Sequence, residues 1–393
     1  MYSENFMYYE KEVNMFYFDN AATGGRKPDQ VQTAIASAVK ICANPGRSGH
    51  KLSLTAANIV QSCRHTLNEF FDGYGFDRVA FTKNCTEALN IAIFGTLKQG
   101  DHVIVSCMEH NSVLRPLEKL KKAGVITYDI CPLEQEGFIG ARNLCLLSLQ
   151  TLLRPNTKLV IITTASNVNG AMPPLEKIRK VIPKHVLLLC DGAQGGGHIP
   201  ISMQKLGIDL LCLAGHKGML GIQGSGALLF SERVNPAPLL HGGTGSISVS
   251  LDMPDFYPDA LEAGTLNYPA IVSLLEGARY LSAHAKQVQS RLSVLSAYFL
   301  KGLQALPDYT PYSIPNPCGI VAFCHHQHDS EHVAGILSEK YDIAVRGGLH
   351  CAPLMHEALG TLQNGLIRVS FSHFNAEREI DRLLAALNEI SIE

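Results

Sequence analysis

The strongest constraint on the fold is an alternation of helical and β-strand patterns that continues from about residue 31 to residue 322. Short apolar runs typical of strands are separated by segments with helical periodicity. Seven such runs begin near residues 78, 102, 125, 158, 185, 209 and 226. Strands that alternate with helices form a mostly parallel sheet with crossover helices. The expected fold is therefore α/β, with a large domain around a mostly parallel seven-stranded sheet.

A change of pattern in the second half of the chain indicates a second domain. Residues 246–259 are rich in Ser, Pro and Asp, and a long helical segment follows from Pro269 to about Leu306. Later strand and helix patterns describe a smaller α+β unit. We predict a large domain over 1–258, with residues 1–16 as a segment able to pack on the small domain. The remainder, 259–393, then forms an interdomain helix and the small C-terminal domain.

Composition narrows the class of function. The chain has 393 residues, 46% of them hydrophobic and 17% charged, as in globular proteins of two or three domains. The net charge is −2 and no block of basic residues exists, so neither nucleic acid nor an anionic membrane is an expected partner. No apolar run reaches the roughly 20 residues that span a bilayer. A small-molecule substrate is expected.

The cysteines and histidines support a cytoplasmic setting without a metal site. The eleven cysteines show no paired short spacings, and the first residues lack the pattern of a secretion signal. Free, mostly buried thiols in a reducing compartment are expected. The histidine-rich segment 324–332, CHHQHDSEH, matches no closed zinc spacing, so no metal is predicted.

Two of the predicted strands end on charged residues. The run VLLLCDGAQ ends on Asp191, and the run LLCLAGHKG ends on Lys217. In an open α/β sheet, the carboxyl ends of the strands form the ligand crevice. A lysine that bonds to an aldehyde and an acid that holds a pyridinium nitrogen protonated are the two groups that pyridoxal phosphate requires. The pattern therefore predicts a pyridoxal phosphate enzyme.

Further residues near these strand ends are candidates for holding the cofactor. Thr86 opens a helix after a strand and could bind a phosphate, although Thr86 or Asn84 could instead be only the N-cap of the helix. His216 adjoins Lys217 and could donate to the same phosphate, and Gln194 could contact the phenolic oxygen. Asn167 follows another strand and is a neutral donor for the same oxygen, although such turns also occur without function.

Three candidates concern the reaction itself. His110 follows a strand and either stacks on a flat ring and shuttles protons, as a catalytic residue, or is a surface residue before a helix. Cys351 lies in the glycine-bearing loop VRGGLHCAPL near Arg346, whose positive charge favours a reactive thiolate. Arg368 suits bidentate binding of a substrate carboxylate, with a structural ion pair as the alternative.

The chain resembles the class V aminotransferase family of fold-type I pyridoxal phosphate enzymes, and specifically its cysteine desulfurase and selenocysteine lyase branch. The resemblance covers nearly the whole chain. It is carried by YFDNAAT, NPGRSGHKLS, FTKNCTEALN, MEHNSV, SNVNG, CDGAQ, GHKG, LEAGTLN, AVRGGLHCAPL and LIRVSFSHFN.

The resemblance implies roles for individual residues. Lys217 bonds to the cofactor, and Cys351 is the sulfur acceptor. The implied cofactor-binding residues are Cys85, Thr86, His110, Asn167, Asp191, Gln194, His216, Lys217 and Thr265. The implied substrate-binding residues are Arg368, Asn20, Ala21 and His50. Thr265 would reach the phosphate of a partner subunit, which implies a homodimer. One departure is Ala214, where many relatives have a phosphate-binding serine.

The expected activity is conversion of L-cysteine to L-alanine, with a persulfide on Cys351 that passes to a sulfur-acceptor protein. Selenocysteine lyase is the nearest alternative. Another lyase or a transaminase of the same superfamily would make Cys351 incidental. A non-catalytic scaffold for sulfur assembly is the remaining alternative.

Overall fold

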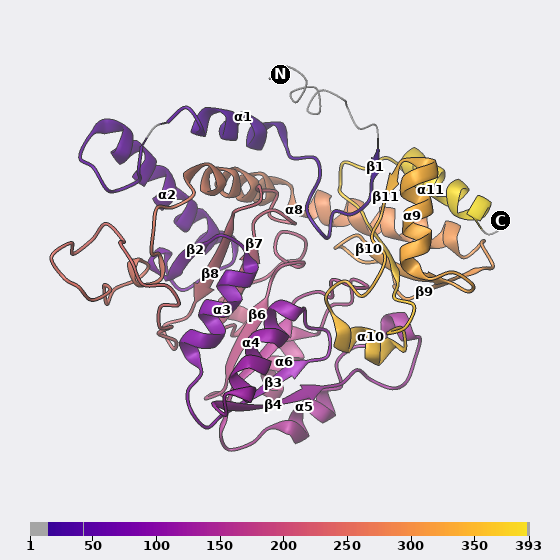
Figure 1. Cartoon of the computed structure of the whole chain (residues 1–393), viewed down its shortest axis with the longest axis horizontal. Helices are drawn as coiled ribbons and strands as arrows, with labels where there is room; N and C mark the ends of the chain where they lie inside the picture. The colour runs from indigo at the N-terminus through magenta and orange to yellow at the C-terminus, as the bar shows by residue number, and fades with distance from the viewer. Residues whose placement is uncertain (1–14, 42, 391–393) are drawn as a thin grey trace, which may run out of the picture.

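The structure is a computed structural model that describes residues 15–41 and 43–390 (Figure 1). A seven-stranded sheet forms its centre, in the order β2-β8-β7-β6-β5-β3-β4. The strands are β2 (Val79–Thr82), β3 (Asp101–Ser106), β4 (Ile126–Cys131), β5 (Thr157–Thr163), β6 (Leu187–Asp191), β7 (Leu210–Ala214) and β8 (Gly226–Phe230). All pairings are parallel except those of β8, which runs antiparallel to β2 and β7. The predicted α/β class and all seven predicted strands are confirmed.

The strands alternate their side chains between two hydrophobic cores. In β6, Leu187 and Leu189 point into the core under α3 and α4, whereas Leu188 and Cys190 point into the larger core on the other face. Burial on both faces explains why these strands read as continuous apolar runs in the sequence.

Helices cover both faces of this sheet (Figure 1). They are α1 (Asp29–Ala38), α2 (Lys51–Phe70), α3 (Cys85–Thr96), α4 (Asn111–Lys122), α5 (Leu146–Leu152), α6 (Leu175–Val181) and α7 (Met203–Leu206). Short 3-10 turns occur at Phe76–Arg78, Ile139–Ala141 and Asp259–Leu261. The helices predicted from residues 86, 112 and 174 are α3, α4 and α6. The predicted segments do not include α1 or α2.

The long helix α8 (Tyr268–Leu303) connects the large sheet to a smaller α+β region (Figure 1). That region contains β9 (Tyr309–Pro311), β10 (Ile320–His325), α9 (Ser330–Tyr341), β11 (Ile343–Ala344), α10 (Pro353–Leu359), β12 (Ile367–Ser370) and α11 (Glu377–Ile390). Strands β12, β10 and β9 form an antiparallel sheet. The division at residue 258 stays a prediction.

The start of the described chain joins the small region. Strand β1 (Phe16–Tyr17) pairs in parallel with β11, and Asp19 forms a bridge with Ser370. The predicted packing segment, residues 1–16, lies outside the described residues except for its last two. Within the described ranges, no helix is both long and apolar enough to cross a membrane.

Candidate active site

A pocket lies at the carboxyl edge of the central sheet, where β5, β6 and β7 end. The parallel pairing of β5 with β6 and β6 with β7 brings the ends of these strands together. Most of the predicted cofactor residues line this pocket: Cys85, Thr86, His110, Asn167, Asp191, Gln194, His216 and Lys217. Ala214 and Thr163 line it as well.

Lys217 and Asp191 provide the pocket with an amine and a carboxylate. Burial lowers the pKa of Lys217, and the negative charge of Asp191 opposes that shift. Lys217 is one of the residues that line the pocket, so its amine is placed to meet a ligand there. Asp191 is 3% exposed, and its Oδ1 accepts the Ala193 N–H at 2.8 Å. Cys85 directs its thiol to the same oxygen at 3.4 Å.

The first turn of α3 contributes one wall. Asn84 is the N-cap, and its Oδ1 accepts the Glu87 N–H at 2.9 Å. The Thr86 hydroxyl lies 2.8 Å from the hydroxyl of Ser112, at the start of α4. The capping role considered from the sequence therefore belongs to Asn84, while Thr86 faces the pocket. Free backbone N–H groups and the helix dipole make this turn an anion site.

His216 forms a second part of that wall. Its Nδ1 lies 3.1 Å from the Thr23 hydroxyl, and burial together with the charges of Lys217 and Lys27 lowers its pKa to about 4. Lys27 donates from Nζ to the His216 carbonyl at 3.1 Å, and burial lowers the pKa of Lys27 to about 8. Lys27 is absent from the sequence-based site because no strand end or motif spacing marks it.

His110 begins α4 as its N-cap, with Nδ1 accepting the Ser112 N–H at 3.0 Å. Burial lowers the pKa of His110 to about 4, so its ring is neutral at neutral pH. The preceding residue, Glu109, is fully buried, and burial raises its pKa well above the usual range. One Glu109 oxygen accepts the Ser106 hydroxyl at 2.5 Å and the Thr163 N–H at 2.6 Å, which ties the ends of β3 and β5 together.

Gln194 and Asn167 link the pocket to other parts of the chain. The Gln194 Nε2 donates to the Ala21 carbonyl at 2.9 Å. The Asn167 Nδ2 donates to the His350 carbonyl at 2.7 Å. Two predicted cofactor contacts thus also hold the N-terminal segment and the Cys351 loop against the pocket.

Cys351 lies in the loop between β11 and α10. His350 and Cys351 both have left-handed backbone conformations, with φ of 50° and 58°. The Arg346 Nη2 donates to the Cys351 Sγ at 3.7 Å, and the Asn111 N–H donates to the Cys351 carbonyl at 2.8 Å. Asn111 follows His110 directly, so the loop backbone contacts the rim of the pocket.

Arg368 is buried behind the pocket. Its Nη2 forms an ion pair with Asp19 at 2.7 Å, and its Nη1 donates to the Asn167 carbonyl at 2.9 Å. The structural ion pair considered from the sequence is thus present. The Arg368 Nε is buried without a hydrogen-bond partner among the described residues, which leaves the guanidinium a free donor. Nearby, Asn20 donates from Nδ2 to the Ser370 carbonyl at 2.8 Å.

Six predicted residues are not part of the lining of this pocket: Asn20, Ala21, Cys351 and Arg368, whose contacts are described above, and Thr265 and His50. Thr265 lines a separate pocket with Lys83 and Glu87. His50 is the N-cap of α2, with Nδ1 accepting the Ser53 N–H at 3.3 Å. Their roles in binding stay predictions. Among the described residues, no group of three or more His, Cys, Asp or Glu side chains is arranged to hold a metal ion.

The model of the family described as "Aminotransferase class-V" matches residues 16–383. The chain belongs to the class V aminotransferase family. Members of this family that it resembles include a probable cysteine desulfurase of Pyrococcus abyssi, 30% identical over 96% of this chain and 94% of that protein. A cysteine desulfurase of Escherichia coli O157:H7 is 32% identical over 97% of this chain and 95% of that protein.

Solved structures of the family share the fold. The apo structure of a cysteine desulfurase from Thermococcus onnurineus has a TM-score of 0.86 and 30% identity, covering 96% of this chain and 95% of that one. A cysteine desulfurase from Escherichia coli in an S-sulfonic acid form has a TM-score of 0.85 and 25% identity, covering 96% and 94%. Membership in the family implies pyridoxal phosphate as the cofactor and an enzymatic function.

Proposed function

We propose that this chain is a pyridoxal phosphate-dependent cysteine desulfurase with the cofactor bonded to Lys217. The observation that carries the proposal is the pocket at the sheet edge, where Lys217 and Asp191 face the first turn of α3. The cysteine desulfurase names of the relatives, at about 30% identity over nearly the whole chain, support the substrate.

The residues present fit the cofactor. Lys217 supplies an amine in the lining of the pocket, Asp191 supplies a buried carboxylate, and α3 supplies an anion-binding N-terminus. When bound, pyridoxal phosphate supplies an aldehyde that bonds to amines and a ring that accepts electrons from the substrate. Thr86 and His216 would hold its phosphate, and Asp191 would hold a proton on its ring nitrogen.

The remaining pocket residues orient the ring. His110 is neutral at neutral pH, so it stacks on a flat ring without adding charge. Gln194 and Asn167 would donate to the phenolic oxygen with amide hydrogens not used in their present bonds. Orientation of this kind lowers the barrier by fixing the reacting atoms before the reaction.

Lys217 and Arg368 act on the amino acid substrate. Arg368 would bind the carboxylate through its free donors, with Asn20, Ala21 and His50 as further predicted substrate contacts. Lys217 would take and return the α-proton, because burial lowers its pKa and favours the neutral amine that a base requires.

Cys351 receives the sulfur. The Arg346 guanidinium donates to its Sγ and orients the sulfur, which as the thiolate attacks the sulfur of L-cysteine. The carbon–sulfur bond of the substrate breaks, a sulfur–sulfur bond forms on Cys351, and the carbon skeleton leaves as L-alanine. Transfer to a sulfur-acceptor protein and assembly as a homodimer, with Thr265 reaching the partner's phosphate, complete the proposal.

Replacing Cys351 by Ser tests the assignment. The variant should keep the cofactor absorbance and lose sulfide release from L-cysteine under reducing conditions. Cys145→Ser, which changes another free cysteine that is only partly buried, is the matched control and should behave as the wild type. Unchanged sulfide and alanine formation in Cys351→Ser would remove Cys351 from the mechanism. Selenide release by that variant from L-selenocysteine would favour selenocysteine lyase instead.

A further inference from the structure

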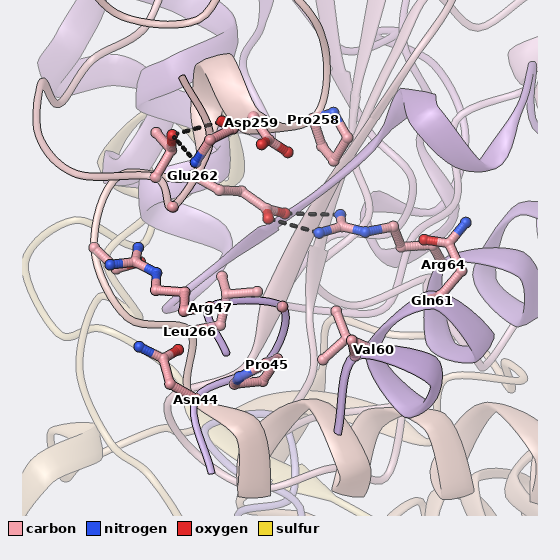
Figure 2. A pocket seen from close by; sticks show the side chains of 16 residues that line it. Asn44, Pro45, Arg47, Val60, Gln61, Arg64, Pro258, Asp259, Glu262 and Leu266 are labelled. Atoms are coloured by element: carbon pink, nitrogen blue, oxygen red, sulfur yellow. Dashed lines mark hydrogen bonds and ion pairs between the residues drawn. The ribbon is translucent and has the colours of Figure 1, made fainter. Parts of the chain in front are cut away.

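A buried ion pair lies away from the Lys217 pocket. Arg64, from the middle of α2, and Glu262, after the 3-10 turn at Asp259–Leu261, meet in a two-fold contact at 2.7 and 2.6 Å (Figure 2). Arg64 is 5% exposed and Glu262 is 9% exposed. Such a pair is costly to bury, and it is retained only where its geometry is good and further hydrogen bonds satisfy both groups.

Both members of the pair also hold strand β2. The Glu262 Oε1 accepts the Phe81 N–H at 2.6 Å. The Arg64 guanidinium donates to the Val79 carbonyl and lies over the Phe81 ring, 4.5 Å from its centre. The pair is therefore attached to the backbone of β2 at two points.

Strand β2 leads directly into the proposed phosphate site of its own subunit. It ends at Thr82, and α3 begins at Cys85 with the free N–H groups that would face the phosphate. A shift of β2 would move this helix start, because only Lys83 and Asn84 separate the two elements.

Glu262 is also close in sequence to Thr265, which lies three residues later. The proposed function assigns Thr265 to the cofactor phosphate bound by the partner subunit. Arg47 fixes the same segment, since its Nη2 donates to the carbonyls of Gly243 and Gly264 at 2.8 and 2.9 Å. Figure 2 shows Arg47 and Arg64 among the residues that line the same pocket as Glu262. The Glu262 carboxylate thus contacts β2 through one oxygen while its own backbone belongs to the Thr265 segment.

We infer that the Arg64–Glu262 pair is a positioning device that sets the helix start of its own phosphate site and the Thr265 segment of the partner's site relative to each other. The inference rests on the proposed function. It gives one ion pair an effect on two cofactor sites of a dimer. Neither residue touches the cofactor in this arrangement.

The first test measures pyridoxal phosphate affinity by reconstitution of the apoprotein. Glu262→Gln keeps the shape of the side chain and loses the charge, and it should weaken cofactor binding about tenfold, a change of about 1.4 kcal/mol. The KM for L-cysteine at saturating cofactor should stay unchanged. The double variant Glu262→Gln/Arg64→Met should lose little more than either single variant.

Arg64→Lys serves as a second variant that keeps the charge and loses the two-fold geometry, and it should show an intermediate loss. The matched control is Arg233→Met, which breaks the contact at 3.0 Å with the buried Asp209 at the opposite end of β7. The control should lower thermal stability without changing cofactor affinity. Wild-type affinity in both Arg64→Lys and Glu262→Gln would overturn the inference.

Hybrid dimers separate the effect of the ion pair on the phosphate site of its own subunit from its effect on the phosphate site of the partner subunit. When one subunit carries Lys217→Ala, the only adduct trapped by borohydride forms in the other subunit. In the first hybrid, Glu262→Gln lies in the subunit that keeps Lys217, so it disturbs the start of α3 in that same subunit. In the second hybrid, Glu262→Gln lies in the Lys217→Ala subunit, so it disturbs the Thr265 segment that this subunit contributes to the phosphate site of its partner. Each hybrid should bind the cofactor about threefold more weakly than a hybrid with both Glu262 residues intact.

Full affinity in either hybrid would overturn the inference, because the ion pair would then act on one site at most. Failure of the proposed function gives a different result. In that case wild-type protein itself would form no borohydride-trapped adduct at Lys217, and the inference would fall with it.

Discussion

The two reactive groups of the proposed site are held in different ways. Lys217 follows β7, whose residues are all buried; the strand pairs with β8 along its whole length and with β6 over its first three residues. Cys351 lies in a loop held by the Asn111 N–H, the Asn167 amide and the Arg346 guanidinium. The amine is therefore positioned by the sheet, and the thiol by a few contacts from separate parts of the chain.

The difference in how Lys217 and Cys351 are held suits their proposed tasks, which are cofactor binding and sulfur transfer. Each hydrogen bond on the loop contributes only about 0.5–1.5 kcal/mol, and each left-handed residue costs on the order of 1 kcal/mol. The position of Cys351 thus depends on individual contacts of its loop, whereas Lys217 follows a strand that is buried in the central sheet. A sulfur carrier must reach an acceptor, but a cofactor-binding lysine must stay in place.

The largest expected effect comes from the sheet side of the site. Lys217→Ala should lower turnover of L-cysteine by about 10⁴-fold, the upper end of what a proton-transferring group contributes. It should also abolish the borohydride-trapped adduct, while alkylation of Cys351 by iodoacetamide should proceed at the wild-type rate. An altered alkylation rate would show that the two regions are not held independently.

Asp191→Asn should have the next largest effect. The variant removes the charge that opposes the burial-induced fall in the pKa of Lys217, and it removes the acid proposed for the ring nitrogen. Turnover should fall roughly 10²- to 10³-fold, the usual cost of losing one preorganised electrostatic group. The cofactor should still form the Lys217 adduct, and wild-type turnover would exclude Asp191 from the mechanism.

The contrast between residues placed at strand ends and residues held by distant contacts also explains what the sequence could predict. Asp191 and Lys217 follow continuous apolar runs, and parallel strands bring their carboxyl ends to one edge, so local pattern and one topological rule suffice. Candidate cofactor residues such as Thr86 and His110 could be predicted for the same reason, since each stands where a strand passes into a helix.

Other contacts depend on tertiary structure that no local pattern encodes. Lys27 reaches the His216 carbonyl across 189 positions of the chain, and Asp19 reaches Arg368 across 349. Glu109 could not be recognised from the sequence for another reason. Its burial depends on its contacts with Ser106 at the end of β3 and Thr163 at the end of β5. Helix α2, which carries Arg64, was missed although its buried positions recur with helical spacing.

On the loop side, Arg346→Met should slow alkylation of Cys351 by iodoacetamide roughly tenfold, the effect of about 1.4 kcal/mol. The reason is that the Arg346 Nη2 donates to the Cys351 sulfur and holds it in position for attack. Alkylation of Cys145 provides an internal control, and the Lys217 adduct should form normally. An unchanged rate at Cys351 would mean that the contact does not activate the thiol.

The smallest expected effect concerns the histidines packed beneath that loop. His356, in α10, lies with its ring centre 5.6 Å from that of His350, and its Nδ1 lies 2.8 Å from the Thr361 hydroxyl. His356 is fully buried, and burial lowers its pKa from the usual 6.5 to about 4. In the unfolded chain the ring takes up a proton near pH 6.5, whereas in the folded chain it does so only near pH 4.

The unfolded state therefore binds more protons between these two values, and the stabilising contribution of neutral His356 is present above pH 6.5 and lost as the pH falls toward 4. Between pH 7 and pH 5 this amounts to up to about 2 kcal/mol, from about 1.4 kcal/mol per pKa unit. Urea unfolding should show that His356→Gln loses less stability over this interval than the wild type, while the exposed control His185→Gln loses as much. Equal losses in all three proteins would show that the buried ring beneath the Cys351 loop does not contribute to acid sensitivity.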